Sequence, residues 1–113
     1  MQKTYDVKVK GEYDVIVVGS GPAGMGAAIS SGRLGAKTLI IESLGRLGGI
    51  STSGMMSHFT GSVGSKLYWE VLKRAGENNQ FDKSLTHIID PEFLTLTYIE
   101  MLEEAKVDIL CYT

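Results

Sequence analysis

The apolar and polar residues of this chain follow a pattern that predicts strands and helices in turn. Residues 15–18 are all apolar and predict a strand, beginning near Tyr13, that we expect to be buried on both faces. A helix over 22–34 follows, and 37–42 predicts a second buried strand. A strand, a helix and a strand in this order are typical of a parallel sheet in an α/β protein.

Helical spacing returns after residue 65. Apolar side chains of residues 66–76 fall on one stripe, which predicts a helix. The segment 90–92 has the sequence Asp-Pro-Glu, which predicts the start of another helix, with Asp90 as N-cap and Pro91 at its first position. The apolar run in 106–112 predicts a third buried strand.

These elements predict a doubly wound, Rossmann-like parallel sheet. Right-handed crossovers place the later strands on one side of the first, so we expect the strand order 3-2-1. The first strand is then an uncovered apolar edge, which invites aggregation unless another strand covers it. We therefore expect a partial domain, with residues 1–113 as the N-terminal piece of a longer protein.

Two segments have no clear assignment. Residues 43–65 contain six glycines and six serines without helical or strand spacing, and such a long loop is either functional or disordered. Residues 5–10 alternate apolar and polar side chains, which fits either an edge strand or an extended lead-in.

The run from Asp14 to Gly24, with the sequence DVIVVGSGPAG, places three glycines where the first strand turns into the first helix. Gly19 permits the tight turn, Gly21 lets a pyrophosphate approach the backbone, and Gly24 lets the helix pack on the strand. Pro22 sits in the first helical turn, where its missing N–H costs nothing. The helix N-terminus offers free N–H groups and a partial positive charge to a diphosphate. The alternative is that these glycines only build a turn.

An acid follows the second predicted strand. Glu42 lies eighteen residues after Gly24, where a carboxylate can accept hydrogen bonds from ribose hydroxyls. The same negative charge repels a 2′-phosphate. The sequence therefore favours FAD or NAD(H) as ligand and disfavours NADP(H).

Composition narrows the function classes. The chain has 113 residues, 43% of them hydrophobic, and a formal net charge of −2, which fits one globular unit. No apolar run approaches the ~20 residues of a membrane span, and no secretory pattern or basic cluster is present. We expect a cytoplasmic protein with no membrane or nucleic-acid partner. Because Cys111 is the only cysteine, this chain alone builds no disulfide or iron–sulfur cluster, and we expect no metal site.

The chain resembles the N-terminal part of the FAD-dependent oxidoreductases that share the glutathione-reductase type of FAD/NAD(P)-binding, Rossmann-like fold. The resemblance rests on the segments 14–24, 41–42 and 47–54, and more weakly on 90–92, 102–105 and 107–110. It implies bound FAD, with the pyrophosphate over 19–24, the ribose on Glu42 and the loop 46–52 beside the pyrophosphate and ribityl chain. The residues implied to bind the cofactor are Gly19, Gly21, Pro22, Ala23, Gly24, Glu42, Ser43, Arg46, Gly48, Gly49, Ser51 and Thr52.

Several of these assignments leave alternatives open. Ser51 and Thr52 either donate to flavin or ribityl oxygens or cap the next turn. Disulfide reductases of this fold carry a redox-active cysteine pair here, where this chain has Ser51 and Met56, so electron transfer from flavin to a disulfide is not expected. His58 has a possible role as proton donor or flavin attachment point, although a lone loop histidine usually has neither.

The resemblance implies an FAD-binding segment of an enzyme that moves hydride between an organic substrate and flavin. No catalytic acid or base is recognisable in this chain. One alternative is the NAD(H)-binding domain of a dehydrogenase, which does not need Gly48-Gly49, and another is a truncated, non-catalytic nucleotide-binding module. The expected partners are FAD, an unknown small-molecule substrate and the remaining domains of a parent protein.

Overall fold

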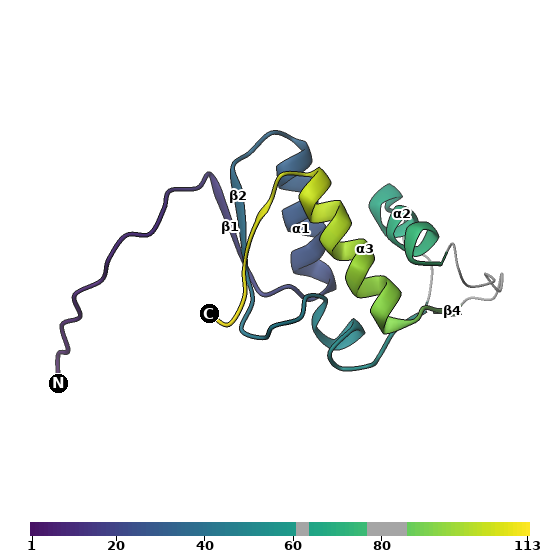
Figure 1. Cartoon of the computed structure of the whole chain (residues 1–113), viewed down its shortest axis with the longest axis horizontal. Helices are drawn as coiled ribbons and strands as arrows, with labels where there is room; N and C mark the ends of the chain where they lie inside the picture. The colour runs from purple at the N-terminus through teal and green to yellow at the C-terminus, as the bar shows by residue number, and fades with distance from the viewer. Residues whose placement is uncertain (61–63, 77–85) are drawn as a thin grey trace.

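A computed structural model describes residues 1–60, 64–76 and 86–113, with residues 86 and 87 as backbone only (Figure 1). The elements in chain order are β1 (Val15–Val18), α1 (Pro22–Arg33), β2 (Thr38–Ile41), the short 3-10 turn η1 (Gly49–Ser51), β3 (His58–Thr60), α2 (Lys66–Gly76), β4 (Thr86–Ile88), α3 (Pro91–Glu104) and β5 (Asp108–Leu110). The strands and helices predicted from the sequence are all present, and most are shorter by a few residues at their ends.

Three of the strands form one parallel sheet in the order β1-β2-β5. Ile16 pairs with Leu39, and Ile40 pairs with Ile109 in the same sheet. This arrangement confirms the predicted order 3-2-1 and leaves the outer edge of β1 unpaired among the described residues. The carboxyl ends of all three strands therefore meet at one edge of the sheet.

Both α1 and α3 lie on the same face of this sheet, and α2 packs outside them (Figure 1). The core fills the space between the sheet and the helices, with Ile29 of α1, Ile40 of β2 and Met101 of α3 completely buried. Ala28, a small residue on the sheet-facing side of α1, is buried as well, so the helix approaches the strands closely.

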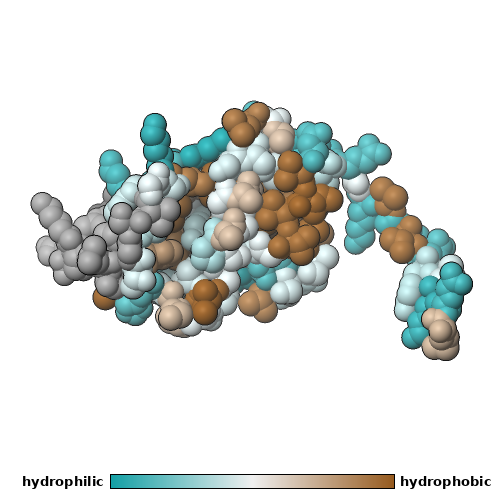
Figure 2. Space-filling model, turned by 180° about the vertical axis from the view of Figure 1, so that it is seen from behind, coloured by the Kyte–Doolittle hydropathy of each residue, from teal (hydrophilic) through white to brown (hydrophobic). Residues whose placement is uncertain are grey.

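The opposite face of the sheet is bare. Ile16 is 54% and Val18 81% exposed, and the side chains of β5 are all exposed. Figure 2 shows apolar side chains gathered on the side of the molecule that carries the sheet. The prediction that the first strand is buried on both faces is therefore wrong within this chain, because helices cover one face only. The predicted burial of the third strand is wrong as well, since the side chains on both faces of β5 are exposed.

The helix ends follow the predicted signals. Asp90 caps α3, and its Oδ1 accepts a hydrogen bond from the Glu92 N–H at 2.8 Å. Gly35 follows α1 with φ +88°, and its N–H donates to the Gly32 carbonyl at 2.9 Å. Both interactions satisfy backbone groups that a helix terminus leaves unpaired.

The stretch 43–65 contains structure that its sequence did not predict. Beyond η1, β3 pairs with β4 in a two-stranded antiparallel ribbon. Residues 61–63 of this stretch lie outside the described part of the chain. Residues 1–12 form an exposed, extended lead-in rather than an edge strand (Figure 1). Among the described residues, no helix has the length and apolar character needed to cross a membrane.

Candidate cofactor site

The predicted glycine turn lies at the carboxyl end of β1. Gly19 has φ +92°, and its N–H donates to the Ile41 carbonyl of β2 at 2.8 Å. A Cβ on Gly24 would lie 1.9 Å from the Gly19 carbonyl oxygen, so α1 packs directly on the turn. The close packing predicted for Gly24 is thereby confirmed.

Gly21 has a different environment. Its backbone is extended, with φ −61° and ψ 173°, so the conformation itself does not require glycine. No other atom lies within 4 Å of the position that a Cβ would occupy. The space beside the Gly21 Cα is therefore open within this chain.

The same residue is the N-cap of α1 and provides no side-chain cap. Pro22 has no N–H, and the first helical hydrogen bond runs from the Met25 N–H to the Gly21 carbonyl at 2.9 Å. The amides of Ala23 and Gly24 thus have no acceptor within the helix. Together with the helix dipole they favour an anion at this point.

A second glycine segment packs against the first. Gly48 has φ +107° and Gly49 φ +58°, and a Cβ on Gly49 would lie 3.0 Å from the Gly21 Cα. The Gly48 N–H is shared between the carbonyl oxygen of Ser20 at 2.9 Å and its Oγ at 3.2 Å. Two segments almost thirty residues apart in the sequence therefore form one side-chain-free wall.

Glu42 lies at the same edge of the sheet and is 6% exposed. Its Oε2 accepts hydrogen bonds from the Ser20 N–H at 2.9 Å and from the Ser20 hydroxyl. Its Oε1 accepts from the Leu44 N–H at 2.9 Å and the Ser43 hydroxyl at 3.1 Å. Led by Ser20, these donors lower the pKa of Glu42 to about 2, so the carboxylate is ionised at neutral pH.

The hydrogen bonds of Glu42 bear on its predicted contact with ribose. Four donors use the four acceptor positions of the carboxylate. The amides of Ser20 and Leu44 are fixed in the backbone, whereas the hydroxyls of Ser20 and Ser43 can rotate away. A sugar hydroxyl can therefore replace a serine hydroxyl on Glu42 while the carboxylate stays in place.

Arg46 is held by α3. Its Nε donates to the Thr95 Oγ1 at 3.0 Å, and its Nη1 pairs with the Glu92 carboxylate at 2.9 Å. Its Nη2 is buried without a hydrogen-bond partner among the described residues. The guanidinium thus joins the loop to the first turns of α3, and its contact with a cofactor stays a prediction.

Ser51 and Thr52 are buried, and both use their hydroxyls within the loop. The Ser51 Oγ donates to the Gly48 carbonyl at 2.6 Å, and the Thr52 Oγ1 donates to the Leu47 carbonyl. The geometry favours the alternative in which they hold the turn. Their predicted contact with flavin or ribityl oxygens is not tested by these bonds.

Ser20 was not among the predicted site residues, and its hydrogen bonds to Glu42 and Gly48 join the two halves of the site. The sequence did offer a signal for it, because Ser20 is a polar residue between Gly19 and Gly21, and the next strand along the chain is followed by the acid Glu42. His58 lies exposed on β3, and its chemical role stays a prediction.

The fold and this edge of the sheet together define a dinucleotide-binding α/β unit. The family model described as FAD dependent oxidoreductase matches residues 14–113. The chain therefore belongs to the FAD dependent oxidoreductase family, and the predictions of the family and of FAD as its cofactor are confirmed.

Relatives and solved structures agree with this assignment. The chain is 41% identical over 70 residues to the soluble pyridine nucleotide transhydrogenase of Mycobacterium bovis. The aligned segment covers 61% of this chain and 14% of that protein. It is 46% identical over 50 residues to the mitochondrial dihydrolipoyl dehydrogenase of Schizosaccharomyces pombe, covering 42% of this chain and 10% of the relative.

Among solved structures, the thioredoxin reductase of Lactococcus lactis aligns with a TM-score of 0.53 at 28% identity, over 88% of this chain and 25% of that one. THI4 of Thermovibrio ammonificans aligns with a TM-score of 0.65 at 22% identity, over 88% of this chain and 38% of the other, and shows the fold alone. The predicted Rossmann-like fold is confirmed. The chain spans about a seventh of the length of the transhydrogenase.

Proposed function

We propose that residues 1–113 bind the ADP half of FAD in an oxidoreductase that moves hydride between an organic substrate and the flavin. When bound, the flavin supplies the redox chemistry, and this chain binds and orients it. The pyrophosphate lies over the amides at the start of α1, and the adenosine ribose donates to Glu42. Membership of the family and the geometry of the glycine turn support this assignment.

One observation carries the proposal: Gly21 lacks a side chain although neither its backbone conformation nor its neighbours require this. A glycine without a structural reason, at an uncapped helix N-terminus and beside a buried acid, fits the close approach of a diphosphate. The Gly49 backbone against Gly21 extends the same bare wall. These features fit the ADP part of the cofactor that defines the family.

The test is the variant Gly21→Val, which places a branched side chain where the pyrophosphate is proposed to lie. We expect the purified wild-type protein to bind FAD, measured by quenching of flavin fluorescence, and the variant to lose at least about tenfold in affinity. The variant should unfold close to the wild-type urea concentration, because no atom beyond the adjacent residues lies within 4 Å of the position of its Cβ.

Gly64→Ala is the control, since Gly64 also has open space around it but lies far from the turn in the sequence. Unchanged FAD affinity in Gly21→Val would refute the proposed pyrophosphate position. Tight binding of NADH with no affinity for FAD would instead favour the NAD(H)-binding dehydrogenase domain.

We also propose that residues 1–113 are the N-terminal part of an FAD-binding domain in a longer chain. The bare apolar face of the sheet and the unpaired edge of β1 support this, because exposed apolar strands are otherwise prone to aggregate. Besides FAD, the proposed partners are then the remaining domains of the longer protein and a small-molecule substrate. A single cysteine fits the reducing cytoplasm, which we propose as the location.

Val18→Lys tests the covering of the sheet. In the 113-residue chain, where Val18 is 81% exposed, the lysine should leave the unfolding free energy unchanged. In a longer protein the same lysine would be buried and should destabilise it strongly. Leu34→Lys, at an exposed position after α1, is the control for both proteins. Equal stability of Val18→Lys in both would contradict a covered sheet.

A further inference from the structure

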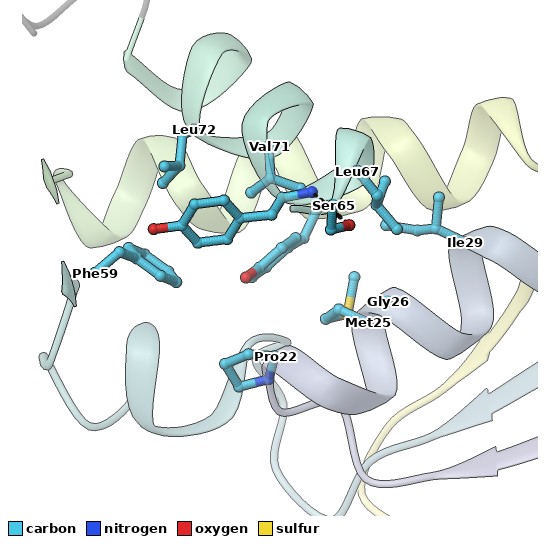
Figure 3. Close-up of a pocket in the computed structure, with 11 residues that line it drawn as sticks. Pro22, Met25, Gly26, Ile29, Phe59, Ser65, Leu67, Val71 and Leu72 are labelled. Atoms are coloured by element: carbon cyan, nitrogen blue, oxygen red, sulfur yellow. Dashed lines mark hydrogen bonds between the residues drawn. The ribbon is translucent and has the colours of Figure 1, made fainter. Parts of the chain in front are cut away.

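A cavity of about 210 Å³, partly open to solvent, lies between α1, α2, α3 and β3, on the helix side of the sheet. Figure 3 shows the side chains of Pro22 and Met25 from α1, Phe59 from β3 and Leu72 from α2 around this space. Within the described part of the chain, no charged side chain lines it. An occupant of this cavity is therefore neutral and mostly apolar.

The walls of the cavity include three aromatic rings, from Phe59, Tyr68 and Tyr98. Phe59 and Tyr68 meet edge to face, with ring centroids 6.2 Å apart and planes at 70°. A further flat ring between such walls gains the same edge-to-face or stacked contacts. Since apolar protein cavities of about 150 Å³ take up benzene, this larger cavity has room for one or two fused rings.

Gly26 gives an independent sign that something occupies this space. It lies inside α1, where glycine is less favourable than alanine, and it lines the cavity. Gly32, in the same helix, needs to be glycine because a Cβ there would lie 2.5 Å from the Ala105 carbonyl oxygen. A Cβ on Gly26 would have no atom within 4 Å, so no packing within the described chain explains it.

One polar group of the lining is left unpaired. The Tyr68 hydroxyl is buried and has no hydrogen-bond partner among the described residues. The Tyr98 hydroxyl, in contrast, has a hydrogen-bond partner in Ser51. Burial, the larger effect, raises the pKa of Tyr98, whereas this hydrogen bond lowers it in part. Buried hydroxyls are normally paired, so the Tyr68 hydroxyl is available to an occupant of the cavity once the Tyr68 ring turns towards it.

We infer that this cavity is a second binding site, which takes a small neutral molecule with a flat one- or two-ring body and one hydrogen-bonding group. The rings lie between the aromatic walls and above Gly26, and the polar group pairs with the Tyr68 hydroxyl. The site is independent of the proposed pyrophosphate position, although Pro22 adjoins both.

Indole and indene are matched probes, because they share size and shape and only indole has an N–H. We expect the wild-type protein to bind both saturably, followed by shifts of the methionine methyl signals in NMR spectra. Gly26→Leu should abolish this binding by filling the cavity, while Gly26→Ala, the control for the loss of a helix glycine, should keep it. Tyr68→Phe should weaken indole about fivefold and leave indene unchanged.

FAD titrations separate this inference from the proposed function. Gly21→Val should keep indole binding while losing FAD, and Gly26→Leu should keep FAD while losing indole. The inference is overturned if neither probe binds the wild-type protein, or if Gly26→Leu binds indole as well as Gly26→Ala does. Displacement of indole by FAD would also overturn it, since the cavity would then belong to the cofactor.

Discussion

Replacing Glu42 by glutamine tests the centre of the site. The substitution keeps the shape of the side chain but removes its charge and turns one acceptor oxygen into an NH₂ donor. Four donors, from Ser20, Ser43 and Leu44, converge on the wild-type carboxylate. In the variant, at least one donor of the protein faces another donor, so a buried hydrogen bond is lost.

The pKa of Glu42 gives the size of the effect. The folded protein lowers this pKa from 4.5 to about 2. At about 1.4 kcal/mol per pKa unit, the shift corresponds to at most about 3.5 kcal/mol of stability. Because the glutamine oxygen still accepts part of these hydrogen bonds, we expect roughly 1 to 2 kcal/mol for the substitution.

The direction with pH follows from the lowered pKa. A carboxylate whose pKa is lower in the folded state stabilises the fold fully above its unfolded pKa. That contribution is lost as the pH falls from about 4.5 towards 2. The stability difference between wild type and Glu42→Gln should therefore be largest near neutral pH and shrink at acidic pH.

Urea unfolding followed by circular dichroism, repeated between neutral pH and pH ~2.5, measures this difference. The ion pairs of Glu70 and Glu104 also weaken in acid, but they are common to both proteins and cancel. Glu103→Gln, at an exposed position on α3, removes the same charge and should change stability little. A stability difference for Glu42→Gln that stays constant from neutral to acidic pH would refute the reasoning.

Three further substitutions test the parts that surround Glu42, each by urea unfolding. Gly24→Ala should destabilise the fold by about 3 kcal/mol or more, because its Cβ meets the Gly19 carbonyl oxygen, and wild-type stability would disprove the close packing. Asp90→Ala should cost about 1 kcal/mol through loss of the α3 cap, and no loss would mean that the cap contributes nothing. Thr52→Val should cost about 1 to 3 kcal/mol by leaving the buried Leu47 carbonyl without this hydroxyl, whereas a neutral result would indicate that another donor replaces it.

The secondary structure was predictable because the signals are local. The apolar run at 15–18, the Asp90 cap and Gly35 each fix an element within a few residues, and the crossover rule fixes the strand order. The exposed face of β1 was not predictable in this way. Burial depends on what covers each face of the sheet. A continuous apolar run such as 15–18 is typical of a strand covered on both faces, but the run does not show whether the covering elements lie within these 113 residues.

The site was predictable only in part, for a related reason. Backbone requirements appear in the sequence as glycines, so Gly19, Gly24 and the pair at 48–49 could be found. The direction of a long side chain is set by tertiary contacts. The contacts of the Arg46 side chain with α3 therefore could not be predicted from the residues next to it in the sequence. Strands β3 and β4 were missed because each has only three residues and lacks the apolar run that marks the equally short β5.

The glycines of the turn separate the requirements of folding from those of binding. A side chain at Gly24 would collide with the protein itself, so this glycine is needed for the fold to form. A Cβ at Gly21 would meet no atom beyond the adjacent residues, so on the proposed function this glycine matters when the cofactor approaches. If both were needed for folding alone, Gly21→Val and Gly24→Ala would lower stability alike. We expect instead that Gly24→Ala loses stability, and that Gly21→Val keeps its stability and loses FAD.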